Sequence, residues 1–183
     1  MTTLILTAEN YAFGPSGKLL TVASLLRKKK YKLIFIGEGT AYQLCSKFPF
    51  DEIYMCDTSS KTVTNLVKKV YPKASMLISV MDKPSVFVAQ KFNLPVAFID
   101  SLFWYWYEIP SFLWSVEFYF KQQSFNDDRN MKKYAHKIHN LISVGPIINE
   151  IGLKQKNKIN QLLITFGGME AKGWYKVGVD TYY

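Results

Sequence analysis

The sequence predicts an α/β fold with a Rossmann-like, mostly parallel sheet that carries helices on both faces. Short apolar runs of β type alternate with amphipathic runs of helical period from the first residues onward. The helical runs have the length, about 10 to 15 residues, that joins neighbouring parallel strands. Apolar residues make up 49% of the 183 residues, which is enough for a buried core.

The first β-α unit is the clearest. Residues 3–8 form an apolar run suited to a strand buried on both faces, and a turn with Gly14 and Pro15 follows. We expect a helix to begin near Ser16, because leucines, valines and alanines then recur at helical spacing. Its last turn carries the basic run 27–30, where the helix dipole favours cations.

The same unit recurs along the next 70 residues. The expected elements are strand 31–37, helix 40–47, strand 52–56, helix 59–71 stopped by Pro72, strand 76–80, helix 84–92 and strand 96–99. Right-handed crossovers between such strands give a parallel sheet.

Beyond Asp100 the pattern changes. An aromatic tract at 103–120 holds three of the four tryptophans, and its secondary structure stays open. A helical segment at 127–140 and a sixth strand at 141–144 follow. We expect residues 1–148 to form one Rossmann-like domain, 149–160 a linker, and 161–183 the start of a second domain that is truncated, because a strand at 162–166 ends in two glycines.

Composition excludes several classes of protein. No apolar run reaches the roughly 20 residues of a membrane-spanning helix, and the N-terminus lacks the basic and small-residue features of a secretory signal. Cys45 and Cys56 form no metal or disulfide pattern, so we expect reduced thiols and a cytoplasmic location. The net charge of +9 comes almost entirely from Lys, with Arg only at Arg27 and Arg129, so no nucleic-acid partner is expected.

Carboxylates follow five of the expected strands, where an open parallel sheet binds its ligands. A carboxylate at this edge could act as a general base. The competing interpretation is helix capping, which we favour for two of them, Asp57 and Asp82. The full set is Glu9, Glu38, Asp57, Asp82 and Asp100.

Two glycine-containing turns do not match the sequence motifs that bind nucleotide cofactors. A phosphate loop would need Gly at Ala12 and Ser or Thr at Leu19, and a dinucleotide fingerprint would need Gly at Tyr42. No nicotinamide or flavin cofactor is therefore expected, and the first loop is either an anion-binding helix start or a plain turn. His136 and His139 lack a third ligand, so we expect no metal site.

The aromatic tract 103–120 has three interpretations that the sequence leaves open. Its rings could pack in the core and against another domain, stack on a sugar or base, or contact a membrane surface at headgroup depth.

Several short motifs resemble the N-terminal, acceptor-side domain of GT-B fold glycosyltransferases, and within that group the cytosylglucuronate synthase-related proteins. They are the loop Tyr11-Ala12-Phe13-Gly14-Pro15-Ser16-Gly17-Lys18-Leu19, the segment Asp100-Ser101-Leu102-Phe103-Trp104, the turn Val144-Gly145-Pro146 and the run Thr165-Phe166-Gly167-Gly168. This resemblance extends to about Glu170.

The resemblance implies that a small or nucleobase-like acceptor binds the first domain, and a nucleotide-sugar donor the second, without a metal or cofactor. Glu9 and Asp100 are then the catalytic candidates. The acceptor-binding candidates are Tyr11, Phe13, Gly14, Ser16 and Ser101, and the donor-binding candidates are Gly167 and Gly168. Because nearly all of the second domain is missing, we expect this chain to be inactive alone. The alternative is a non-catalytic Rossmann-like binding module or one that contacts a membrane peripherally.

Overall fold

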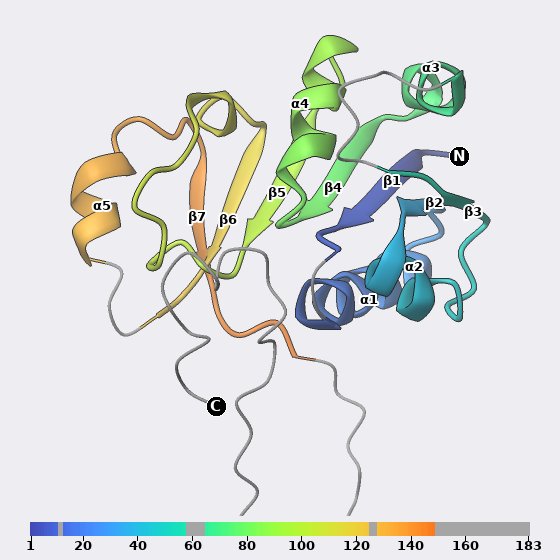
Figure 1. Cartoon of the computed structure of the whole chain (residues 1–183), viewed down its shortest axis with the longest axis horizontal. Helices are drawn as coiled ribbons and strands as arrows, with labels where there is room; N and C mark the ends of the chain where they lie inside the picture. Colours follow the sequence, from blue (N-terminus) through green and yellow to red (C-terminus); the bar gives the residue numbers. More distant parts are fainter. Residues whose placement is uncertain (11–12, 58–64, 125–127, 149–183) are drawn as a thin grey trace, which may run out of the picture.

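The computed structural model describes residues 1–10, 13–57, 65–124 and 128–148 (Figure 1). Within them, seven strands form one sheet in the order β3-β2-β1-β4-β5-β6-β7. The strands are β1 (Thr3–Ala8), β2 (Lys32–Gly37), β3 (Glu52–Met55), β4 (Met76–Val80), β5 (Val96–Asp100), β6 (Phe118–Gln122) and β7 (Leu141–Val144). The helices are α1 (Phe13–Lys28), α2 (Gly39–Cys45), α3 (Asn65–Val70), α4 (Lys83–Lys91) and α5 (Asp128–Tyr134), with 3₁₀ turns η1 (Tyr71–Lys73) and η2 (Ser111–Leu113).

Every pair of neighbouring strands is parallel, which confirms the predicted fold class. At the centre, Ile5 of β1 lies between Ile34 of β2 and Leu77 of β4. All strands therefore end at the same edge of the sheet, and the loops that follow them share that edge.

The sheet separates two hydrophobic clusters, one on each face. Leu6 and Phe35 pack with α1 and α2 through Leu19 and Ala41 on one face. On the other face, α3, α4, η2 and the α5 region pack over side chains such as Phe98. Figure 1 shows α1 and α2 together on one side and α4 on the opposite side of the central strands. Burial of both faces explains why the central strands are continuous apolar runs.

The first helix begins three residues before the predicted Ser16. Phe13 and Gly14 are already helical, and Pro15 lies in the first turn. Proline fits there, because its missing N–H has no partner in the first turn and its fixed φ suits the helix. A turn was predicted at these residues, and that prediction is wrong.

The aromatic tract contains a strand that the sequence pattern did not reveal. In β6, Tyr119 and Lys121 are buried while their neighbours are half-buried. The strand pairs with β5 and β7, so the predicted sixth strand at 141–144 is the seventh of the sheet. The helix predicted at 127–140 is shorter, since α5 ends at Tyr134.

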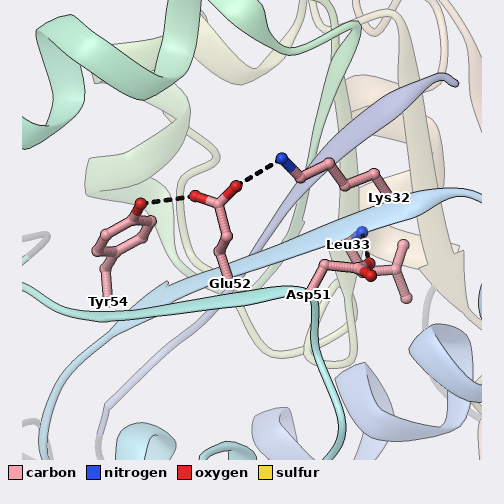
Figure 2. Close-up of polar contacts among 5 residues, drawn as sticks. All are labelled: Lys32, Leu33, Asp51, Glu52 and Tyr54. Atoms are coloured by element: carbon pink, nitrogen blue, oxygen red, sulfur yellow. Dashed lines mark hydrogen bonds and ion pairs between the residues drawn. The ribbon is translucent and has the colours of Figure 1, made fainter.

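Charged side chains mark the edge strand β3. The ammonium of Lys32 in β2 lies 2.5 Å from a Glu52 oxygen, and the Tyr54 hydroxyl donates to the other oxygen at 2.6 Å (Figure 2). The Asp51 carboxylate accepts the Leu33 N–H at 2.7 Å. The hydrogen bond from Lys32 is the largest cause that lowers the pKa of Glu52. Charges on an edge strand discourage pairing with another chain.

The predicted linker 149–160 and the predicted start of a second domain at 161–183 lie outside the described residues. Among the described helices, none has both the length and the apolar character needed to cross a membrane.

Candidate functional site

The strand order reverses between β1 and β4. The chain passes from β1 to β2 and β3 on one side, and then returns to place β4, β5, β6 and β7 on the other. At such a switch point the two following loops run in opposite directions and leave a crevice, where open α/β sheets bind ligands. The loops after β1 and β4 therefore border the candidate site.

Glu9 begins the loop after β1. Its backbone N–H donates to the Val80 carbonyl of β4 at 2.9 Å, and its side chain is half-buried. The next residue, Asn10, accepts the Thr40 N–H at 2.8 Å and so ties this loop to the start of α2. Glu9 is therefore held at the switch point while keeping access to solvent. Tyr11, a predicted acceptor-binding residue, lies outside the described residues.

The other predicted acceptor-binding residues of this region differ in their exposure to solvent. Phe13 is exposed, and Gly14 is exposed with open space around it, so both are available to a ligand at the start of α1. Ser16 is fully buried beside the Cys45 thiol of α2. An acceptor contact for Ser16 stays a prediction, and its observed surroundings are those of a packing residue.

The loop after β4 provides a helix cap and a cation. Asp82 accepts the Ser85 N–H at 3.3 Å and the Ser85 hydroxyl, which confirms the predicted capping role. Lys83 follows, with its ammonium 3.5 Å from the centre of the Trp106 ring. Burial lowers the pKa of Lys83, and the charges of Asp100 and Glu9 oppose that change. Lys83 is thus a cation near both predicted catalytic carboxylates.

Asp100, the last residue of β5, is fully buried and accepts several hydrogen bonds. Its Oδ1 accepts the Leu102 N–H at 2.8 Å, and its Oδ2 accepts the Tyr119 hydroxyl at 2.5 Å. The Trp106 indole N–H lies 3.1 Å from Oδ1 and 3.0 Å from Oδ2. These bonds fix the loop after β5, so Asp100 is placed to organise the site. Direct contact with an acceptor stays a prediction.

Burial is also the main electrostatic influence on this network. It raises the pKa of Asp100, against the opposing effects of its hydrogen bonds with Tyr119, Leu102 and Trp106 and of the Lys83 charge. Burial and the Asp100 carboxylate raise the pKa of Tyr119. The phenol is therefore a stable hydrogen-bond donor to Asp100.

Strand order separates the five carboxylates that the sequence placed at this edge. Glu9 directly follows β1 and Asp100 ends β5, and these two strands lie on either side of β4, about 10 Å apart. Glu38 and Asp57 follow β2 and β3 on the other side of β1, and Asp57 is exposed at the edge strand. The structure thus groups Glu9, Lys83 and Asp100.

Ser101, a predicted acceptor-binding residue, follows Asp100 directly. Its N–H donates to the Met81 sulfur at 3.2 Å, and its hydroxyl oxygen is enclosed without a hydrogen-bond partner among the described residues. The predicted donor-binding residues Gly167 and Gly168 lie outside the described residues. His136 and His139 are both exposed, and the described part of the chain contains no group of three or more His, Cys, Asp or Glu side chains that could hold a metal ion.

This arrangement can support proton transfer and the binding of a flat or polar molecule. Glu9 supplies a carboxylate with solvent access, Lys83 a nearby positive charge, and Trp106 an aromatic ring between Lys83 and Asp100. Sequence reasoning missed three members of the network, Lys83, Trp106 and Tyr119. Lys83 is one of many lysines, and Tyr119 belongs to the strand that the aromatic pattern hid.

Comparison of the sequence with protein-family models and with curated proteins finds no match. Solved structures do match. MurG from Acinetobacter baumannii aligns with a TM-score of 0.54 and 11% identity over 85% of this chain and 48% of its own. LpCGTa, crystallised in complex with UDP, aligns with a TM-score of 0.53 and 10% identity over 81% of this chain and 54% of its own. The chain spans about half the length of these GT-B glycosyltransferases, and its described part has the Rossmann-like fold of one of their domains.

Proposed function

We propose that this chain is the acceptor-side, N-terminal half of a nucleotide-sugar-dependent glycosyltransferase. The observation that carries the proposal is the grouping of Glu9, Lys83 and Asp100 at the switch point of a sheet whose fold is that of a GT-B domain. LpCGTa, one of the proteins with this fold, was crystallised with UDP, which supports a nucleotide-sugar donor here. The acceptor is a small or nucleobase-like molecule.

In this proposal Glu9 is the general base. It is the half-buried carboxylate at the switch point, and it would take the proton from the acceptor hydroxyl or ring nitrogen as that atom attacks the sugar. Phe13, Gly14 and Tyr11 shape the acceptor pocket. Asp100 holds Trp106 and the loop after β5 in place from its buried position. Gly167 and Gly168 open the donor side.

The chain alone is inactive in this proposal, since donor binding and transfer need a second domain. A protein that contains both halves should transfer sugar from a labelled UDP-sugar to a nucleobase or small hydroxyl acceptor.

The test compares Glu9→Gln with Asp57→Asn in the two-domain protein. Both changes remove one carboxylate charge from the same edge of the sheet, but Asp57 is exposed at the edge strand. Loss of a general base is expected to lower kcat by about 10² to 10⁴, and Asp57→Asn should leave it unchanged. Equal rates for the two variants would remove Glu9 from the mechanism. The absence of any thermal shift with UDP or UDP-sugars would contradict the transferase.

A second candidate function is a non-catalytic Rossmann-like binding module. The observation that favours it is the complete burial of Asp100, which leaves one of the two predicted catalytic carboxylates out of reach of a ligand. A protein of this kind would bind a small molecule at the switch point without turning it over. Binding that survives Glu9→Gln, with no transfer in the two-domain protein, is the outcome expected for this candidate.

A further inference from the structure

We infer that the loop after β5, together with α5, forms a surface that docks on anionic lipid bilayers. Two sets of side chains define it. The aromatic loop is Trp104, Tyr105 and Tyr107, and the basic rim is Arg129, Lys132, Lys133 and Lys137. This inference does not depend on the proposed transferase activity.

The three rings of the aromatic loop are exposed within four consecutive residues, which also include the half-buried Trp106. Trp104 is 39% exposed, Tyr105 47% and Tyr107 80%, whereas Phe103 and Ile109 on either side are buried. The rings of Trp104 and Tyr105 contact each other edge to face, with centres 5.7 Å apart. Exposed aromatic side chains gathered in this way are typical of an interaction surface.

Helix α5 holds the loop through four side chains, so the rings are presented on a fixed backbone. Asn130 donates to the Trp106 carbonyl at 2.8 Å and to the Phe103 carbonyl, and Arg129 donates to the Trp106 carbonyl at 2.9 Å. Lys133 donates to the Tyr107 carbonyl at 3.2 Å, and the Tyr134 hydroxyl accepts the Ile109 N–H at 3.1 Å. Figure 1 shows α5 beside the segment that connects β5 and β6.

One of these residues also brings positive charge to the aromatic loop, since the Lys133 ammonium lies 5.3 Å from the centre of the Tyr107 ring. Lys137, three residues beyond α5, lies 5.1 Å from the centre of the Trp114 ring, which is outside the aromatic loop. Arg129, Lys132 and Lys133 are exposed on α5. The acidic residues of the loop 101–117 and of α5 are Glu108, next to Tyr107, Asp128, the first residue of α5, and Glu117. Glu117 directly precedes β6, so it lies at the opposite edge of the parallel sheet from the end of β5. Basic residues therefore predominate beside the aromatic loop.

The chemistry of this surface fits a bilayer better than an apolar protein partner. Its exposed aromatic residues are Trp and Tyr, whose apolar rings and polar tips favour the depth of the lipid headgroups. Among the described residues of the loop, no aliphatic side chain is exposed. Each Lys or Arg near an anionic leaflet adds about 1 kcal/mol of attraction. In the inferred binding mode the rings insert at headgroup depth while Arg129 and Lys133, which contact the same loop, attract the anionic lipid.

The test is cosedimentation of the 183-residue protein with vesicles. Vesicles of phosphatidylcholine mixed with phosphatidylglycerol should bind the protein, and those of phosphatidylcholine alone should bind much less. Raised salt should weaken binding, because it screens the basic rim. Trp104→Ser and Tyr107→Ser should each reduce binding at least about threefold, an effect expected from lost interfacial burial.

The charge variants have a matched control. The double variant Lys132→Glu/Lys133→Glu should bind anionic vesicles more weakly than wild type, by about fivefold or more for each unit of positive charge lost. Lys28→Glu with Lys29→Glu changes net charge equally at the exposed end of α1, and Leu25→Ser removes a 59% exposed side chain of α1. Both control variants should bind anionic vesicles nearly as wild type does. Circular dichroism and urea unfolding should show that all the variants fold.

Lipids with brominated acyl chains give a second measurement. They should quench the fluorescence of bound protein, and Trp104→Phe should lose most of that quenching while keeping its binding. The inference is overturned by absent or equal binding to the two kinds of vesicle, or by equal loss in the α1 control. It is also overturned if the protein self-associates without lipid and Tyr107→Ser abolishes that association, because the surface would then serve a second copy of the chain.

Discussion

The indole N–H of Trp106 lies 3.1 Å and 3.0 Å from the two carboxylate oxygens of Asp100, a side chain with no exposure to solvent. The Lys83 ammonium lies over the face of the same Trp106 ring, in a cation–π contact. One tryptophan thus joins the loop after β4 to the end of β5. We therefore expect Trp106 to stabilise the candidate site, a role that the aromatic sequence tract alone did not indicate.

Trp106→Phe removes the indole donor and leaves the buried Asp100 carboxylate with fewer hydrogen bonds. We expect the free energy of unfolding to fall by about 1 to 3 kcal/mol at neutral pH, as for a buried polar group that loses a partner. Urea unfolding measures it. Trp104→Phe is the control, since Trp104 is 39% exposed, and a change within about 0.5 kcal/mol is expected there. Equal losses in the two variants would show that ring packing outweighs the hydrogen bond.

Asp100→Asn changes how stability depends on pH. Burial raises the pKa of Asp100 in the folded protein, so between its unfolded and folded pKa values the folded state binds the proton more tightly. The stability that this group contributes is present below the unfolded pKa and is lost as pH rises through the folded pKa.

The test of this linkage is urea unfolding from about pH 4 upward, because Asp has an unperturbed pKa of about 3.9. Wild type should lose more stability over this range than Asp100→Asn, which has no proton to release. A steeper decline in the variant than in wild type would show that the hydrogen bonds to Asp100 outweigh its burial.

Gly39→Ala should destabilise the loop that carries Glu9. Gly39 has φ of +50°, and a Cβ there would clash with the Asn10 side-chain oxygen. The cost is expected to be about 1 to 3 kcal/mol, from backbone strain and the displaced Asn10. Gly17→Ala is the matched control, because it lies inside α1 with nothing within 4 Å of the added carbon. That change should be neutral or stabilise the protein by up to about 1 kcal/mol. Thermal unfolding of both variants checks the pair.

The two cysteines should differ in reactivity. Burial raises the pKa of the Cys45 thiol to about 12, although contact with Ser16 opposes the rise, and Cys56 is only half-buried. A thiol reagent at pH 8 should therefore modify Cys56 in the native protein and reach Cys45 only after unfolding. Mass spectrometry of Cys56→Ser after labelling is the measurement. Rapid labelling of Cys45 in that folded variant would mean that α1 and α2 separate readily.

The local sequence pattern was sufficient to predict an element where a segment fits only one kind of secondary structure. The strand Met76–Val80 has the predicted bounds, and Asp82 caps the helix that follows it, since a carboxylate three residues before a free N–H can cap wherever it lies in the fold. The sequence pattern did not predict the strand Phe118–Gln122, because aromatic residues fit a strand, a ligand-stacking loop and a buried core equally well. The start of α1 was also misplaced, since Gly14-Pro15 signals a turn unless the chain is already helical at Phe13.

The sequence by itself determined that this protein is an α/β chain with parallel strands, and that Glu9 and Asp100 lie at the carboxyl ends of two of them, because periodicity and strand ends are local properties of the chain. Only the tertiary structure decided that β4 lies between β1 and β5, which brings Lys83 to both carboxylates and encloses Asp100 among Trp106 and Tyr119. Strand order and burial arise from contacts between residues far apart in sequence. A carboxylate that looks like a free base in the sequence therefore becomes a buried hydrogen-bond acceptor in the fold.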